Sequence, residues 1–222
     1  MRATARARCQ FMFFWCSVFF ENKMKLALDE RNALVDNLKR DNDKLNLVVG
    51  DLTHRLHLVE QNMRDSNIEI NGIPEHRHEN LCNVVEQLVK TVDAQVSAQE
   101  IIHVTRVSKL SKDSNRPRAV IVKLRTPRQR DVILASVSTF NKKNNKDKLS
   151  TQHLGLAGTA APVFVSEHLS PTNKALHAAT RIKAKECKYK FTWVQNGRIF
   201  VRKDEFSEAL LIRNMDSVAS IK

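Results

Sequence analysis

The sequence predicts an α+β protein in three parts: an N-terminal coiled-coil helix, a split βαββαβ domain, and a small C-terminal domain built from a helix and a hairpin. Three observations support this prediction. Apolar residues repeat every 3.5 positions from about residue 24 to 65, strand-like and helix-like segments alternate from 66 to 166, and an Asn-Gly pair joins two β-prone runs near residue 196. The expected divisions are an extension at 1–23, the coiled coil at 24–66, and domains at 67–166 and 167–222.

The composition favours a polyanionic partner. The 222 residues include 37 Lys and Arg against 24 Asp and Glu, a formal net charge of +13. Hydrophobic residues make up 42% of the chain, which is enough for packed cores. Neither of the Gly-rich phosphate-binding patterns is present. A chain this basic points to nucleic acid, with an anionic membrane as the weaker alternative.

The extension at 1–23 is first basic and then apolar. Its apolar run at 11–20 is short for a membrane span, and no small-residue cleavage site follows it. The extension is therefore open to three interpretations: a signal or anchor segment, a non-native addition, or an ordinary part of the protein. A membrane partner is not expected. The four cysteines form no CxxC pair, which predicts reduced and mostly buried thiols in an intracellular protein, with nucleus and cytoplasm both open.

One heptad register runs from Met24 to Met63, and ten of its twelve a and d positions are apolar. This spacing predicts self-association into a dimer or trimer, whereas a single helix packed on its own domain is the alternative. Asn42 occupies an a position, where Asn fixes the register of paired helices. The predicted oligomerisation residues are Val35, Leu38, Asn42, Leu45, Val49, Leu52, Leu56 and Val59.

The following hundred residues predict the element order βαββαβ. Strands are expected at 67–73, 101–107, 118–125 and 162–165, and helices at 79–94 and from Pro127 to about Val137. This order is that of the split βαβ arrangement, with an antiparallel sheet and both helices on one face. Between Lys142 and about Ala161 we expect a polar and mobile connection.

The split βαβ arrangement is shared by RNA-recognition domains and by many unrelated domains. RNA-recognition domains stack bases on aromatic side chains of their two central strands. Here no Phe, Tyr or Trp occurs between Phe20 and Phe140, so nucleic acid would have to be held by charge. The basic runs at 109–118 and 142–148 either contact phosphates or are solvated loops. The candidate binding residues of the first run are Lys109, Lys112, Arg116 and Arg118.

The C-terminal segment brings cations and aromatic residues together. Ser170 followed by Pro171 predicts a helix start, Asn196-Gly197 predicts a hairpin turn, and a short closing helix is expected near 206–212. Residues 170–203 contain nine basic residues and one acidic residue. The candidate binding residues in this segment are Arg181, Lys185, Lys188, Lys190, Trp193, Arg198, Arg202 and Lys203.

Tyr189, Phe191 and Trp193 share one face of the first hairpin arm. Their rings either pack the hairpin onto the preceding helix or stay exposed, where they stack on bases. Because a two-stranded hairpin needs packing to be stable, we favour the first interpretation.

The order of the segments resembles two known groups of proteins. The stretch Val-Phe-Val-Ser-Glu-His-Leu-Ser-Pro at 163–171 resembles the junction between two domains in the first open-reading-frame proteins of L1-type retrotransposons. The hairpin at 194–205 and the strand start at 67–73 are more similar to the baculovirus FP (few polyhedra) protein family and its insect relatives.

The two resemblances imply an oligomeric nucleic-acid-binding protein of retroelement-derived or FP-like type. In the L1 group the implied activity is single-strand binding and chaperoning, and in the FP group it is an effect on virion envelopment and protein traffic. Carried over residue by residue, the resemblance assigns binding to Arg116, Arg118, Arg198, Arg202 and Lys203.

The function expected from all these observations is non-catalytic binding of single-stranded RNA or DNA, mostly through phosphates and without a cofactor or metal. A structural or adaptor protein acting through its coiled coil is the alternative. An enzyme is not expected, because His54, His57 and the more isolated histidines form no visible triad or metal-binding set.

Overall fold

The computed structural model describes residues 2–108 and 115–221, with side chains described from Phe20 onward except Ala27. It divides into two compact units, residues 1–56 and 57–222. The second unit contains the two sheets that the described residues form. Each unit is described by itself below.

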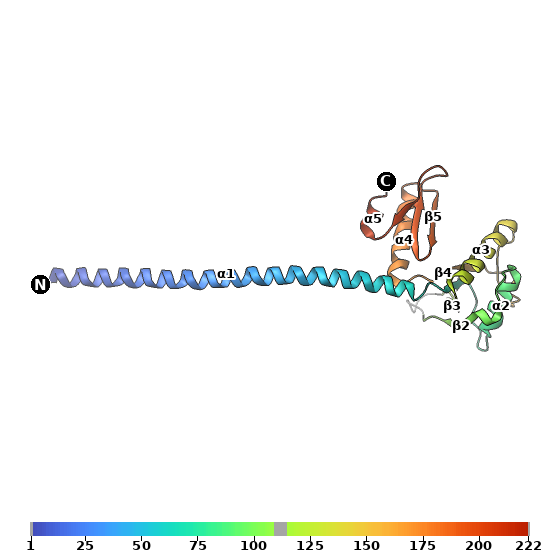
Figure 1. Cartoon of the computed structure of the whole chain (residues 1–222), viewed down its shortest axis with the longest axis horizontal. Helices are drawn as coiled ribbons and strands as arrows, with labels where there is room; N and C mark the ends of the chain where they lie inside the picture. Colours follow the sequence, from blue (N-terminus) through green and yellow to red (C-terminus); the bar gives the residue numbers. More distant parts are fainter. Residues whose placement is uncertain (1, 109–114, 222) are drawn as a thin grey trace. The chain divides into compact units, whose positions relative to one another are not determined.

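Helix α1 (Arg2–Asn62) is continuous and begins more than twenty residues before the predicted start at residue 24 (Figure 1). The helix can run this far because no Pro and only one Gly, Gly50, occur within it. The division between an extension and a coiled-coil segment therefore has no counterpart in secondary structure. Within the described part of the chain, no helix is long and apolar enough to cross a membrane.

The first sheet confirms the predicted split βαβ order. Its strands are β1 (Asn67–Asn71), β2 (Ile101–Arg106), β3 (Val120–Leu124) and β4 (Phe164–Glu167). They lie in the order β2-β3-β1-β4, and all neighbouring strands are antiparallel. Helices α2 (Leu81–Thr91) and α3 (Pro127–Lys143) both cover one face, and a 3₁₀ turn, η1 (Ala98–Glu100), precedes β2 (Figure 1).

Alternation along the two central strands explains this packing. Ile68 and Ile70 of β1 and Val120 and Val122 of β3 are buried together against residues of α2 and α3, such as Leu88. The residues between them face away from the helices. The helices cover one face as the alternating sequence predicts, but the outward Glu69 and Ile121 are also buried, at 8% and 6% exposed.

The connection after α3 differs from its prediction. Helix α3 continues to Lys143, six residues past the expected end, and the following segment is not a mobile polar linker. Leu149 and Leu154 are 1% and 4% exposed and belong to the core of the first sheet. Thr151 ties the segment together, since its Oγ1 accepts from the backbone N–H of Ala161 at 3.0 Å. The burial of these two leucines stabilises the packed conformation of the segment even though most of its other residues are polar.

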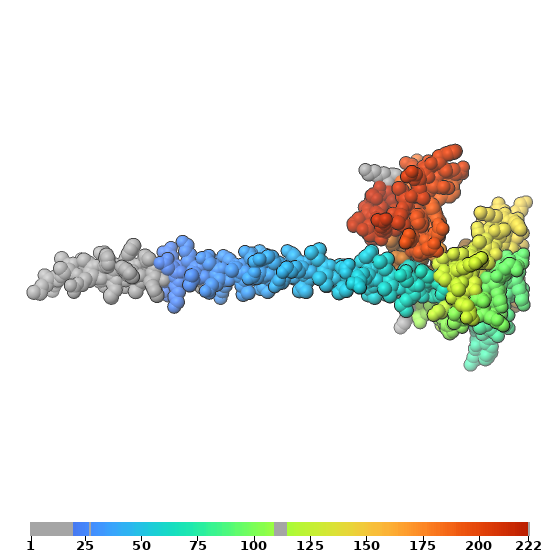
Figure 2. Space-filling model, in the orientation of Figure 1, coloured from blue at the N-terminus to red at the C-terminus, as the bar shows by residue number. Residues whose placement is uncertain are grey.

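The C-terminal residues form a small α+β domain, drawn in orange to red in Figure 2. Its buried residues make up a hydrophobic core of their own. The domain contains α4 (Pro171–Glu186), β5 (Phe191–Gln195), β6 (Arg198–Arg202), β7 (Leu210–Ile212) and α5 (Met215–Ala219). The three strands form an antiparallel sheet in the order β5-β6-β7. The predicted closing helix at 206–212 is wrong: Leu210 to Ile212 pair with β6, and Ile212 is buried in the domain core.

The cysteine prediction is wrong for one of the two thiols whose side chains are described. Cys82 at the start of α2 is exposed, and Cys187 after α4 is half-buried. Both are free thiols. The exposure of Cys82 follows from its place on the outer side of α2, whose buried residues are Val85, Leu88 and Val89.

Candidate nucleic-acid interface

The hairpin formed by β5 and β6 has two chemically different faces. Ile199 and Val201 are 1% and 0% exposed and pack into the domain core with Leu176 of α4. Alternation then places the intervening β6 residues on the opposite, outer face. The outer face of β6 reads Arg198, Phe200, Arg202.

The aromatic residues of β5 lie on this outer face as well. Trp193 pairs directly with Phe200 across the strands, and their rings stack with centroids 5.5 Å apart. Phe191 pairs with Arg202, whose guanidinium carbon lies 4.9 Å from the ring centroid. The favoured interpretation that the three rings pack on the helix is therefore wrong for Phe191 and Trp193. It holds only for Tyr189, which precedes the strand and packs against the domain core.

An open hollow of about 420 Å³ lies at the base of this face. Its lining consists of Lys190, Phe191, Thr192, Trp193 and Arg202. The hollow thus combines two aromatic rings with two cations, and Lys190 Nζ is 5.3 Å from the Phe191 centroid. Flat rings and cations in one cavity suit a ligand that is both planar and anionic.

The predicted binding residues of this domain do not form one patch. Arg198, Arg202, Lys190 and Trp193 belong to the hairpin's outer face or to its hollow, and Lys203 follows directly after β6, with Nζ 5.9 Å from the Tyr189 ring.

Arg181 and Lys185 are exposed on α4, the helix that covers the inner face of the hairpin. They follow the buried residues Thr180 and Ala184 and are rotated by ~100° from them. Lys188 is exposed at the end of α4 with a positive φ of 58°. The helix cations therefore lie apart from the hollow.

The four candidate binding residues of the basic run at 109–118 differ in what the structure shows of them. Lys109 and Lys112 lie outside the described residues. Arg116 is exposed. Arg118 donates from its Nε to Glu75 Oε2 at 2.9 Å, and its backbone N–H donates to Oε1 of the same carboxylate at 2.8 Å. These bonds lower the pKa of Glu75, so the carboxylate stays ionised beside Arg118.

The outer face of the first sheet carries both an acidic and a basic residue on its central strands, Glu69 of β1 and the exposed Lys123 of β3. Glu69 of β1 is 8% exposed and forms an ion pair with Lys174 of α4 at 2.8 Å. Lys174 is therefore already paired with a carboxylate and is less available to a phosphate than an unpaired cation. The edge strand differs, because Phe164 of β4 is 63% exposed beside Asn71. A comparison with the central strands of RNA-recognition domains does not single out Phe164, because its ring lies on an edge strand.

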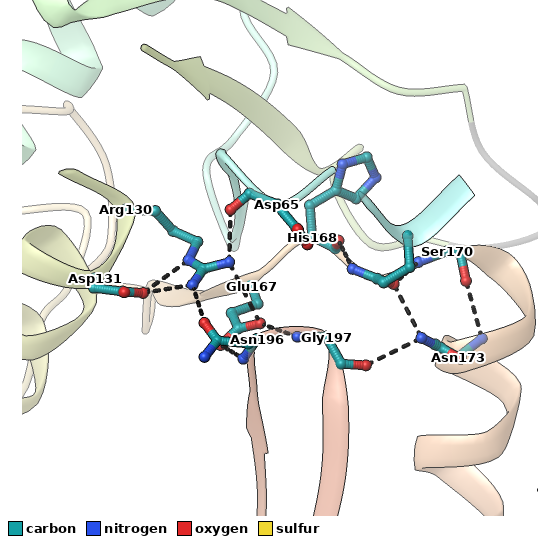
Figure 3. Close-up of polar contacts among 10 residues, drawn as sticks. Asp65, Arg130, Asp131, Glu167, His168, Ser170, Asn173, Asn196 and Gly197 are labelled. Atoms are coloured by element: carbon teal, nitrogen blue, oxygen red, sulfur yellow. Dashed lines mark hydrogen bonds and ion pairs between the residues drawn. The ribbon is translucent and has the colours of Figure 1, made fainter. Parts of the chain in front are cut away.

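The hairpin turn is anchored by a polar junction that the sequence did not reveal (Figure 3). The backbone N–H groups of Asn196 and Gly197 donate to the carboxylate of Glu167, at 3.0 and 2.7 Å. Arg130, which is 2% exposed, donates to Asn196 Oδ1 and to the carbonyl oxygen of Asp65, both at 2.6 Å. The turn is thus held by residues of β4 and α3.

Gln61, in the last turn of α1, adds a second set of contacts to the same junction. Its Oε1 accepts from the backbone N–H of Ser170 at 2.9 Å and from Asn173 Nδ2 at 3.1 Å. Asn173 in turn donates to the carbonyl oxygen of Gly197 at 3.1 Å. Ser170 caps α4, since its side chain accepts from the N–H of Asn173. The predicted helix start is confirmed and is also part of the junction.

His168 lies in the same region, and burial lowers its pKa. The nearby charge of Glu69 opposes this effect, whereas Lys174 and Arg64 reinforce it. The ring's Nδ1 lies 3.3 Å from Asn67 Nδ2, an amide nitrogen that can only donate, which suits the neutral imidazole. Among the described residues, no group of three or more His, Cys, Asp or Glu side chains is placed to hold a metal ion.

Taken together, these features define an α+β chain in which a split βαββαβ domain is joined to a basic domain of helix and three-stranded sheet. Comparison with known families supports one of the two resemblances. Residues 170–222 match the family described as Baculovirus FP protein domain 2, a match that covers α4, β5, β6, β7 and α5. No curated protein matches the chain.

Proposed function

We propose that this protein is an oligomeric, non-catalytic binder of single-stranded nucleic acid that contacts its ligand mainly through the C-terminal domain. The observation that carries the proposal is the outer face of the hairpin, where Arg198 and Arg202 flank Phe200 on one strand and Trp193 lies across from it. Cations beside exposed rings supply both phosphate neutralisation and base stacking.

The free cations of the domain strengthen this proposal. Arg181, Lys185, Lys188 and Arg198 are exposed and make no ion pair with any residue that the structure describes. A phosphate can therefore approach them without displacing a carboxylate. Each such contact releases a counterion, which makes the affinity fall with rising salt.

Self-association is proposed from the exposed stripe of α1. The seven apolar residues of the predicted seam are between 45% and 63% exposed in the single chain. Leu34 and Val48, at the g positions of the same register, are also exposed and widen the stripe. A long apolar stripe with heptad spacing is stabilised by a second copy of the same helix. Joining several binding domains in one oligomer raises the effective concentration of each for the same strand.

The likenesses support the same proposal. The match to FP protein domain 2 covers the domain to which we assign binding. The resemblance to L1-type first open-reading-frame proteins in segment order is in keeping with single-strand binding by an oligomer. An effect on virion envelopment or protein traffic is not part of the proposal.

The test is a salt titration of binding between the full chain and a labelled single-stranded oligonucleotide. The logarithm of the affinity should fall linearly with the logarithm of salt concentration, by about 0.7 for each neutralised phosphate. The double variant Arg198→Gln/Lys203→Gln should weaken binding and reduce the slope by about 1.4. A flat salt dependence would contradict the proposal.

The matched control is Lys23→Gln/Lys90→Gln, which removes the same two charges from exposed positions on α1 and α2, with Lys23 at a c position away from the predicted seam. It should leave the salt slope unchanged, because these residues lie outside the proposed interface. If both double variants lose the same affinity, the binding depends on the net charge of the protein and not on the proposed interface. Absence of binding by the wild type at about 50 mM salt would favour the adaptor alternative, in which the exposed stripe of α1 binds protein partners.

A further inference from the structure

We propose that the hollow beside Trp193 is a base-stacking subsite that holds one nucleotide of a single strand. The base lies against Trp193, and the neighbouring phosphates lie at Arg202 and Lys190. This inference rests on the proposed function and deepens it. It adds a contact that depends on the presence of a base, whereas the cations alone recognise only the phosphate chain.

The rings at the hollow are not required for the core of the domain. Ile199, Val201 and Ile212 form the inner face of the sheet and are at most 4% exposed. An antiparallel sheet with one covered face and three strands is stable without a second covered face. Phe191 and Trp193 are half-buried on the side that faces solvent, which leaves ring surface available to a ligand.

The shape of the hollow suits a polymer segment. Its volume of about 420 Å³ lies within the range of roughly 300–1,000 Å³ that is usual for small-ligand sites. The hollow is open to solvent rather than enclosed. A nucleotide can therefore enter the hollow while it remains joined to the rest of a strand.

The cations of the hollow have unused capacity for an acceptor. Arg202 makes no ion pair with any residue that the structure describes, so its charge is not neutralised by a carboxylate; its buried Nε also lacks a hydrogen-bond partner there, but a surface ligand does not reach this atom. Lys190 Nζ forms an ion pair with Glu205 at 2.6 Å, and both side chains are more than half exposed. Exposed pairs of this kind are weak, so a phosphate can replace Glu205 at Lys190.

The chemistry favours a single strand over a duplex and over an acidic peptide. In a duplex the faces of the bases are occupied by their neighbours, whereas an unstacked base presents a free π-face to an aromatic ring. An acidic peptide would satisfy Arg202 and Lys190 but would leave the face of Trp193 unused. The occupant that uses both the rings and the cations is an unpaired nucleotide within a strand.

The experiment compares two oligonucleotides of equal length, an oligothymidylate and an abasic strand with the same number of phosphates. The protein is the full chain carrying Trp15→Phe, which leaves Trp193 as its single tryptophan. Oligothymidylate should quench Trp193 fluorescence and bind roughly 5- to 150-fold more tightly than the abasic strand, the range expected for one stacked base.

Variants of the lining residues test whether the preference for oligothymidylate over the abasic strand arises at the hollow. In Trp193→Ala, followed by fluorescence anisotropy of labelled strands, the preference for oligothymidylate should disappear, and Phe191→Leu should reduce it. Phe206→Ala is the matched control, because Phe206 is 97% exposed in the same domain but does not line the hollow. This control should keep the full preference. Circular dichroism checks that each variant is folded. If Trp193→Ala does not fold, the loss of preference in Phe191→Leu tests the subsite instead.

Each contrary result has a distinct meaning. Equal binding of the two strands by the wild type would overturn the subsite and leave the proposed function intact. Failure to bind either strand at about 50 mM salt would overturn both. Quenching of Trp193 by polyglutamate as strong as that by oligothymidylate would overturn base stacking in favour of an acidic peptide.

Discussion

Replacing Arg130 with Met should weaken the polar junction around the hairpin turn, although Glu167 still accepts from the amides of Asn196 and Gly197. Arg130 is 2% exposed, and Met fills much of the same space without donating hydrogen bonds. The change leaves the carbonyl oxygen of Asp65 without its donor and deprives Glu167, 9% exposed, of a guanidinium at 3.9 Å. Asn196 is exposed, so water replaces its lost bond. Together these losses cost about 2–4 kcal/mol of unfolding free energy.

For a unit of this size, such a loss lowers the melting temperature by roughly 5–15 °C. Melting is followed by circular dichroism and by Trp193 fluorescence in the Trp15→Phe background, at one fixed chain concentration because self-association shifts the midpoint. Asp131→Asn is the control. The Asp131 side chain, which pairs with Arg130, is 58% exposed, so this substitution should cost less than about 1 kcal/mol of unfolding free energy. A midpoint for Arg130→Met that coincides with the control would refute the reasoning.

Three further changes have defined outcomes. Gly197→Ala should destabilise the protein by at least about 1–2 kcal/mol in urea unfolding, because φ is +70° and the new Cβ would lie 2.6 Å from the Gln61 side chain; no loss would show that the turn is not held as described. His168 has a lowered pKa, so the unfolded state binds more protons and stability should fall as pH drops below about 6.5. In His168→Gln this part of the pH profile should flatten, and an unchanged profile would exclude His168 as its source. Leu45→Asp should reduce the mass measured by light scattering from a multiple of 25.4 kDa to the single chain; a mass of 25.4 kDa for the wild type would contradict the proposed oligomer.

The sequence predicted those elements whose signal is local. Strand β1 alternates apolar and polar residues, and Val120 and Val122 of β3 have the same spacing, so these valines and Ile68 and Ile70 are recognisable as one buried layer, although the outward Ile121 is apolar and buried too. The hairpin turn was recognisable because Asn196 and Gly197 both adopt positive φ, which few other residue pairs tolerate.

The sequence did not predict what depends on distant partners. Arg130 bonds to Asp65 and to Asn196, which lie 65 and 66 positions away, and nothing near Arg130 indicates that its charge is buried. The sequence alone suggests a helix at strand β7, because only three residues define the strand and their pairing with β6 decides its conformation. It also favours core positions for the rings of Phe191 and Trp193, because the sequence does not reveal the third strand, which makes such packing unnecessary.

The anchored hairpin turn has a practical consequence for anyone who dissects this protein. A fragment that starts at residue 170, where the family match begins, keeps the turn but loses the carboxylate of Glu167 that accepts from two of its amides. It also loses the guanidinium of Arg130 and the amide of Gln61, both of which contact this corner. In such a fragment the backbone N–H groups of the turn would lack their carboxylate acceptor. Measurements of turn mobility on the fragment would therefore overstate the mobility of the turn in the intact chain.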